Sequence, residues 1–117
     1  MPAEYDARTN RPIGGDARKP TVVHVTGEID MEHAGELRDV LMTALDGAKA
    51  SSEIIVDLSN SSFCDSSGLN ALLRVREAAL RTGHTLSLAA PSHQMLRLLD
   101  LTGSADLFPV RPGITTQ

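Results

Sequence analysis

Short β-branched runs alternate along this chain with longer stretches in which apolar residues recur at helical spacing. The β-branched runs are bounded by turn-forming residues and predict buried strands. Strands are expected at residues 21–26 (TVVHVT), 54–58, 85–89 and 107–110, and Glu4–Thr9 favours either a short edge strand or a tail. The first of these four strands is expected to end at Gly27, and the second at the polar SNSS cluster that follows Leu58.

Between the strands, apolar residues recur every three or four positions, which predicts three amphipathic helices. Their inward stripes are Ala34, Leu37, Leu41, Ala44 and Leu45 in the first helix, Leu69, Leu72, Leu73, Ala79 and Leu80 in the second, and Met95, Leu98, Leu99 and Thr102 in the third. Asp30 and Ser92 are placed to cap the first and third helices, and Gly47, Gly83 and Gly103 to end the three.

Alternation of strands and helices implies right-handed crossovers and a mainly parallel sheet. We therefore expect a small α/β sandwich, with a mixed sheet of four or five strands and three helices. The expected organisation is an N-terminal edge strand or flexible segment with a Pro- and Gly-rich linker (1–20), one folded domain (21–110) and a flexible C-terminal tail (111–117). Such a sheet is too small for a doubly wound nucleotide-binding fold.

Charge and composition narrow the classes of function. The chain has a formal net charge of −4, and residues 20–110 carry six basic against twelve acidic side chains, a balance of −6. This balance argues against nucleic acid and anionic membranes as partners. Cys64 is the only cysteine, so there is no disulfide framework and no Cys-based metal site. No apolar leader or 18-residue apolar run occurs, so a cytoplasmic location is expected.

The stretch FCDSSGL, residues 63–69, is where candidate chemistry concentrates. Asp65, Ser66 and Ser67 stand at a strand-to-helix turn, where first-turn N–H groups need acceptors. One interpretation is a simple helix cap. The other is a serine that accepts a phosphate, because a helix N-terminus offers free N–H donors and the positive end of the helix dipole.

Other chemistries are weakly supported. A serine hydrolase would need a G-x-S-x-G elbow and a marked histidine base, and the chain has neither. The four histidines are dispersed without metal-ligand spacing, and no phosphate-binding loop is present. We therefore expect no catalytic residue, no metal site and no cofactor. Glu28 and Asp30, in GEID, follow a parallel strand just as Asp65–Ser67 does, so the two acidic loops should be neighbours at one sheet edge.

Four segments together resemble a known family. GEID at 27–30, IIVDLS at 54–59, FCDSSGL at 63–69 and MLRLLDLTG at 95–103 occur in order and at the expected separations. They are similar to STAS-domain proteins of the bacterial anti-sigma factor antagonist type, over about Thr21 to Val110. The resemblance implies a STAS-like sandwich, and a non-enzymatic protein that works by partner switching in transcription regulation and the stress response.

In that family, unphosphorylated antagonist binds an anti-sigma factor serine kinase with a histidine-kinase-like ATPase fold and so frees a sigma factor. The kinase then phosphorylates the antagonist, and a PP2C-type phosphatase reverses the modification. By match, the resemblance implies Ser66 as the phosphate acceptor, Asp65, Ser67 and Gly68 as its supporting turn, and Glu28 and Asp30 as part of the docking surface.

Two features depart from the family pattern. Asn70 stands where many relatives have glycine, so this position is expected to affect how the kinase approaches or which kinase fits. The long N-terminal segment is also less typical. An alternative remains open: a STAS binding subunit of a transporter or stress-sensing complex, without a phospho-switch and with Ser66 serving only in the cap.

Overall fold

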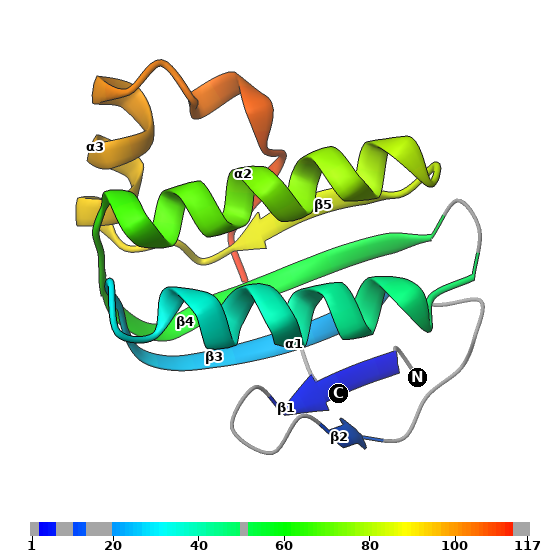
Figure 1. Cartoon of the computed structure of the whole chain (residues 1–117). Helices are drawn as coiled ribbons and strands as arrows, with labels where there is room; N and C mark the ends of the chain where they lie inside the picture. Colours follow the sequence, from blue (N-terminus) through cyan, green and yellow to red (C-terminus); the bar gives the residue numbers. More distant parts are fainter. Residues whose placement is uncertain (1–2, 7–10, 14–19, 50–51, 114–117) are drawn as a thin grey trace.

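A computed structural model describes residues 3–6, 11–13, 20–49 and 52–113 of the chain. In these residues three strands come first, and helices and strands then alternate (Figure 1). The strands are β1 (Ala3–Asp6), β2 (Arg11–Ile13), β3 (Thr21–Ile29), β4 (Glu53–Cys64), β5 (Thr85–Ala89) and β6 (Val110–Arg111). The helices are α1 (Ala34–Asp46), α2 (Ser66–Arg81) and α3 (His93–Leu101), and a 3₁₀ turn covers Ala105–Leu107.

All six strands form one sheet in the order β2-β1-β3-β4-β5-β6. Every neighbouring pair is parallel except β1 with β2, which is antiparallel. The α/β class, the three helices and the mainly parallel mixed sheet are thus confirmed. The sheet has one strand more than the expected upper number, because β2 lies inside the segment that the sequence indicated as a linker.

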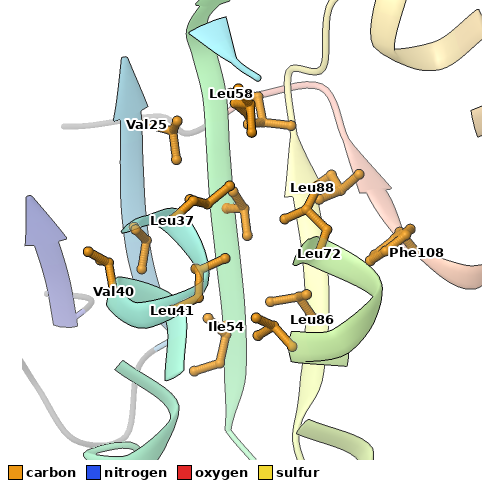
Figure 2. Packing of buried hydrophobic residues seen from close by; sticks show 14 of the residues in the cluster. Val25, Leu37, Val40, Leu41, Ile54, Leu58, Leu72, Leu86, Leu88 and Phe108 are labelled. Carbon is orange, nitrogen blue, oxygen red and sulfur yellow. The ribbon is translucent and has the colours of Figure 1, made fainter. Parts of the chain in front are cut away.

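The main core lies between one face of the sheet and the helices (Figure 2). Alternate residues of the central strands, such as Val23, Val56 and Leu88, point to this face and are fully buried. They pack against the buried stripes of α1 and α2, represented by Leu41 and Leu72. An aliphatic core of this kind uses few aromatic residues, as the composition required.

The helix stripes follow the predicted spacing closely, with two exceptions, Leu80 in α2 and Thr102 at the end of α3. Leu80 was expected to face inward, but it is 53% exposed. The buried stripe of α2 is centred on Leu72, Val75 and Ala79, and at about 100° per residue Leu80 falls on its flank. Thr102 is likewise exposed, because it stands at the C-cap of α3 and its hydroxyl donates to the Leu98 carbonyl.

Two strands run farther than expected. β3 continues through Gly27, whose φ of +85° suits only glycine, to Ile29. β4 continues through the SNSS cluster to Cys64. The ladder between them shifts register twice, between His24 and Thr26 and between Thr26 and Glu28. These irregularities let two polar segments remain paired, and they extend both strands to the same edge of the sheet.

The end of the chain also differs in detail from expectation. Residues 107–110 were expected to form the last strand, but Leu107 closes the 3₁₀ turn and the strand is Val110–Arg111. No helix in the described part of the chain is both long and apolar enough to cross a membrane.

Candidate functional site

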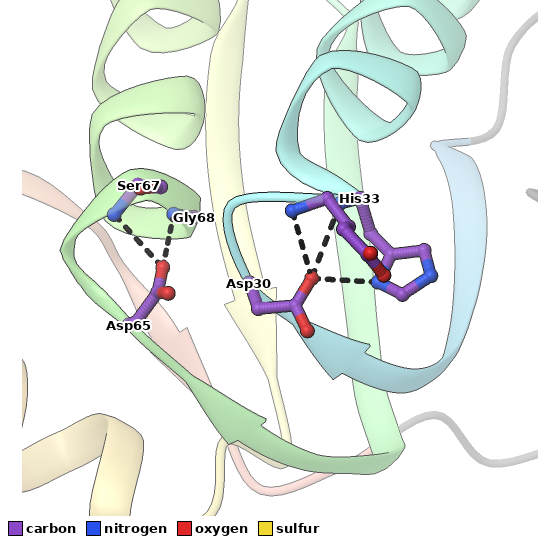
Figure 3. Close-up of polar contacts among 6 residues, drawn as sticks. Asp30, His33, Asp65, Ser67 and Gly68 are labelled. Carbon is purple, nitrogen blue, oxygen red and sulfur yellow. Dashed lines mark hydrogen bonds and ion pairs between the residues drawn. The ribbon is translucent and has the colours of Figure 1, made fainter.

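Two polar turns meet at the carboxyl edge of the sheet. Ile29, the last residue of β3, pairs with Cys64, the last residue of β4, so Asp30 and Asp65 follow neighbouring positions. The backbone N–H of Asp65 donates to the Ile29 carbonyl at 3.1 Å, which joins the second turn to the end of β3. Figure 3 shows the two turns side by side, so the expected proximity of the acidic loops is confirmed.

Asp65 is the N-cap of α2. Its backbone is extended, and one carboxylate oxygen accepts from the N–H groups of Ser67 at 2.9 Å and Gly68 at 3.1 Å. Ser66, the first residue of the helix, is exposed, whereas Ser67 is half-buried. The cap therefore exists, and it occupies two of the N–H donors that we expected a phosphate to use. A phosphate on Ser66 would instead stand beside a carboxylate.

Gly68 allows the first turn of α2 to lie against the strand ends. A Cβ atom at this position would lie 2.6 Å from both Cγ2 and the carbonyl oxygen of Ile29, and 2.8 Å from Sγ of Cys64. Such distances are far inside van der Waals contact, so only glycine fits here without movement. Gly68 consequently sets how closely the Ser66 turn approaches β3.

Gln94 holds the same turn from the other side. Its side-chain carbonyl accepts from the Cys64 N–H at 2.8 Å, and its amide nitrogen donates to the Cys64 carbonyl at 2.6 Å. This pair of hydrogen bonds fastens the start of α3 to the residue before Asp65. Sequence reasoning missed Gln94, since no spacing or motif indicates that a glutamine next to the buried Met95 turns its amide towards a strand end.

Asp30 organises the first turn rather than capping α1 directly. Its carboxylate accepts from the N–H groups of Glu32 at 3.1 Å and His33 at 3.2 Å, and it lies 2.7 Å from Nδ1 of His33 (Figure 3). Helix α1 begins one residue later, at Ala34. The hydrogen bond that His33 donates to the Asp30 carboxylate raises the pKa of His33. Desolvation opposes a fall in the Asp30 pKa, but the hydrogen bonds from His33 outweigh it and lower that pKa.

The remaining predicted positions lie around these turns. Glu28 is exposed on β3 and pairs in register with Phe63 of β4. Asn70 is exposed on α2, where it lines a shallow groove with Arg38 of α1 and Arg74 of α2. Two large apolar side chains, Met31 at 80% and Phe63 at 41%, are exposed near the same edge. The arrangement is a polar surface with apolar contacts, suited to binding a protein.

The nucleophilic side chains of the second turn are Ser66, Ser67 and Cys64. In the described residues, His33 contacts Asp30, and His84 contacts Thr82 and Lys49, so these two histidines hydrogen-bond residues other than the two serines. Burial and the nearby Asp65 raise the pKa of the Cys64 thiol to about 12, which makes it a poor nucleophile.

One group in the described part of the chain has ligand atoms close enough to hold a metal ion: Asp30, Glu32 and His33, all within 4.8 Å of one another. The Nδ1 of His33 is already engaged by Asp30 in this group.

The sequence matches one family model and several known proteins. The family model described as "Mlab, STAS domain" matches residues 15–110. An anti-sigma-B factor antagonist of Staphylococcus epidermidis is 32% identical over 91 residues, which cover 78% of this chain and 82% of the relative.

Two solved structures are also similar. An anti-sigma factor antagonist from Mycobacterium paratuberculosis is 30% identical, with a TM-score of 0.64 over 80% of this chain and 77% of the other. The Bacillus cell fate determinant SpoIIAA in its phosphorylated form is 28% identical, with a TM-score of 0.55 over 76% and 79% of the two chains.

Proposed function

Because the chain belongs to the STAS domain family, we propose that it is an anti-sigma factor antagonist controlled by phosphorylation of Ser66. Unphosphorylated, it binds an anti-sigma factor serine kinase, and the sigma factor is released. Phosphorylation by that kinase ends the complex, and a PP2C-type phosphatase restores binding. The observation that carries the proposal is an exposed serine on a turn fixed by Asp65, Gly68 and Gln94.

The fixed turn suits a serine that acts as substrate of another protein. The partner's active site must receive the Ser66 hydroxyl in one geometry, and an acceptor held by cap, glycine contact and glutamine clamp loses little freedom on binding. The neighbouring Ser67 is half-buried and gives its N–H to the cap, so it is the less accessible hydroxyl. The role of this chain is therefore to bind and to be modified, and the chemistry belongs to the partner.

Electrostatics explains how the phosphate would act as a switch. The added charge of about −1.5 to −2 would stand next to Asp65, whose carboxylate already occupies the N–H groups of Ser67 and Gly68. Glu28 and Asp30 belong to the same edge and add negative charge. The new charge would therefore stand among carboxylates, with Arg38 and Arg74 of the groove beside Ser67 as nearby basic side chains. Burying it against a partner that adds no further positive charge is unfavourable. A hundredfold loss of affinity needs only about 2.7 kcal/mol.

Phosphorylation with the cognate kinase tests the acceptor. The protein is incubated with the kinase and ATP, and the product is mapped by mass spectrometry. Modification of Ser66 is expected in the wild type and in Ser67→Ala, and none at this turn in Ser66→Ala. Modification that persists in Ser66→Ala and still disrupts the complex would contradict the proposal.

Calorimetric titration tests the switch itself. Ser66→Asp is expected to weaken binding of the kinase, since it places a charge where the phosphate would be. Thr85→Asp adds the same charge at the first residue of β5, at the opposite ends of the strands from Ser66. It is the matched control and is expected to bind the kinase as the wild type does. Unchanged affinity in Ser66→Asp would favour the alternative, a STAS subunit that binds its partner constitutively.

A further inference from the structure

Strand β3 is longer than the strand beside it. β1 pairs only with Thr21–His24, so the second half of β3, residues 25–29, has β4 on one side and no described strand on the other (Figure 1). Thr26, Gly27 and Glu28 are exposed. A strand edge that faces solvent presents backbone groups able to pair with another polypeptide.

A cavity of about 300 Å³ lies along this edge. It is lined by every residue from Val25 to Ile29, and by His33, Glu36 and Leu37 of α1. The ladder with β4 shifts register twice within residues 24–28 and Gly27 has a positive φ, so side chains do not alternate regularly in this segment. The exposed Thr26, Gly27 and Glu28 border the cavity together with the first turns of α1, which makes it a groove beside the part of β3 that lacks a described outer neighbour.

The lining has two chemical characters. The nearly buried Val25, Ile29 and Leu37 form an apolar floor with little exposed area, and the exposed side chains of the lining include the carboxylates of Glu28 and Glu36 and the imidazole of His33. Lysine and arginine match this combination, because their aliphatic stems cover apolar surface while their charged heads remain near water and carboxylates. The negative balance of residues 20–110 favours the same kind of partner.

We propose that this groove binds an extended basic segment of a partner protein, which adds as a strand to the edge of β3 at residues 25–29. Backbone pairing supplies the affinity, and a Lys or Arg between Glu28 and Glu36 supplies the specificity. The inference rests on the proposed function only in assigning the segment to the partner that acts on Ser66. A second copy of this chain fits poorly, because pairing two such edges would bring the same glutamates together.

The test uses the full chain, labelled with ¹⁵N, and two capped five-residue peptides, acetyl-TVKVT-amide and acetyl-TVEVT-amide. The lysine peptide is expected to shift the amide signals of residues 25–29 and 33–37 in a saturable way at millimolar concentration. The glutamate peptide should bind at least about fivefold more weakly, as reversal of one exposed charge pair allows.

Two variants of α1 make the charge test specific. Glu36→Lys removes a carboxylate from the groove and should weaken the lysine peptide at least about fivefold. Asp39→Lys makes the same charge change at an exposed position of α1 that does not line the groove. Its affinity for the lysine peptide should stay within about twofold of the wild-type affinity.

Several results would overturn the inference. These are no shifts at residues 25–29, equal binding of the two peptides, or equal effects of the two variants. Signals at this edge that change with protein concentration before peptide is added would show a second copy in the groove instead. The peptide experiment needs no kinase, so its failure leaves Ser66 modification intact, and loss of Ser66 modification with peptide binding preserved would refute only the proposed function.

Discussion

Replacing Gly68 by alanine would add one methyl group at the tightest contact of the candidate site. The new Cβ would meet the Ile29 carbonyl oxygen at 2.6 Å, and this oxygen already accepts the Asp65 N–H. Sγ of Cys64, itself buried, lies 2.8 Å away. A backbone atom and a buried sulfur cannot swing aside as an exposed side chain can, so the first turn of α2 must move away from β3.

Three contributions set the magnitude of the effect, two that destabilise and one that stabilises. Overpacking of this kind costs about 1–3 kcal/mol. Alanine is favoured over glycine within a helix by about 1 kcal/mol, which offsets part of the cost. Movement of the turn also strains the Asp65–Ile29 hydrogen bond, whose net contribution is about 1 kcal/mol. We therefore expect Gly68→Ala to lower the free energy of unfolding by about 1–3 kcal/mol.

Urea denaturation followed by circular dichroism measures this change as a lower midpoint at an unchanged slope. Gly35→Ala is the matched control, because Gly35 also lies in the first turn of a helix and its Cβ would meet nothing within 4 Å. That variant should be as stable as the wild type, or up to about 1 kcal/mol more stable. If Gly68→Ala were equally stable, the argument that close approach requires glycine would be refuted.

Three further predictions concern residues around the sheet. Gln94→Ala leaves the Cys64 N–H and carbonyl without partners and should destabilise by about 2 kcal/mol in urea denaturation, whereas the exposed His93→Ala should change little. Burial acts to raise the Asp57 pKa, but hydrogen bonds from Ser59 and from His24 at 2.7 Å outweigh it and lower that pKa. The stabilisation that these hydrogen bonds give the folded protein should be present above about pH 4 and lost as the pH falls through the lowered pKa of Asp57. Thermal unfolding at several pH values measures this, and Asp57→Asn should remove that part of the pH dependence. The buried Cys64 thiol, with its pKa raised to about 12, should not react with a disulfide reagent at pH 8 in the native protein, and should react fully once urea unfolds it; reaction at equal rates in both states would contradict its burial.

Much of the secondary structure was predictable from patterns that involve only a few neighbouring residues. The 3.6-residue and two-residue periodicities depend only on which side chains avoid water, so they predicted all three helices and the central strands. Caps are local as well: Asp65 and Ser92 accept from N–H groups two or three residues ahead, and Gly83 takes the left-handed φ of +77° that its helix end requires. Parallel topology then predicted that the two acidic turns lie at the same end of the sheet.

Predictions from residue propensity were wrong where pairing with a neighbouring strand outweighed that propensity. The SNSS cluster and Gly27 are typical of turns, yet β3 and β4 pair through both, because each strand satisfies the other's backbone groups and register shifts absorb the mismatch. Asp30 was expected to cap α1, but its carboxylate closes the preceding turn with Glu32 and His33 instead. In each case the deciding partner lies on another element or in a turn whose course the sequence pattern does not specify.

By itself, then, the sequence determined the three helices, the central strands, the aliphatic core and the cap that Asp65 forms before the two serines. Only the tertiary structure showed that Gly68 lies against Ile29, that Gln94 clamps Cys64 from 30 residues away, and that the edge of β3 borders a groove with Glu28 and Glu36. The physical reason is the distance along the chain over which each interaction acts. Periodicity and capping arise within a few residues of the chain, whereas close approach, clamping and an open strand edge depend on how distant segments pack.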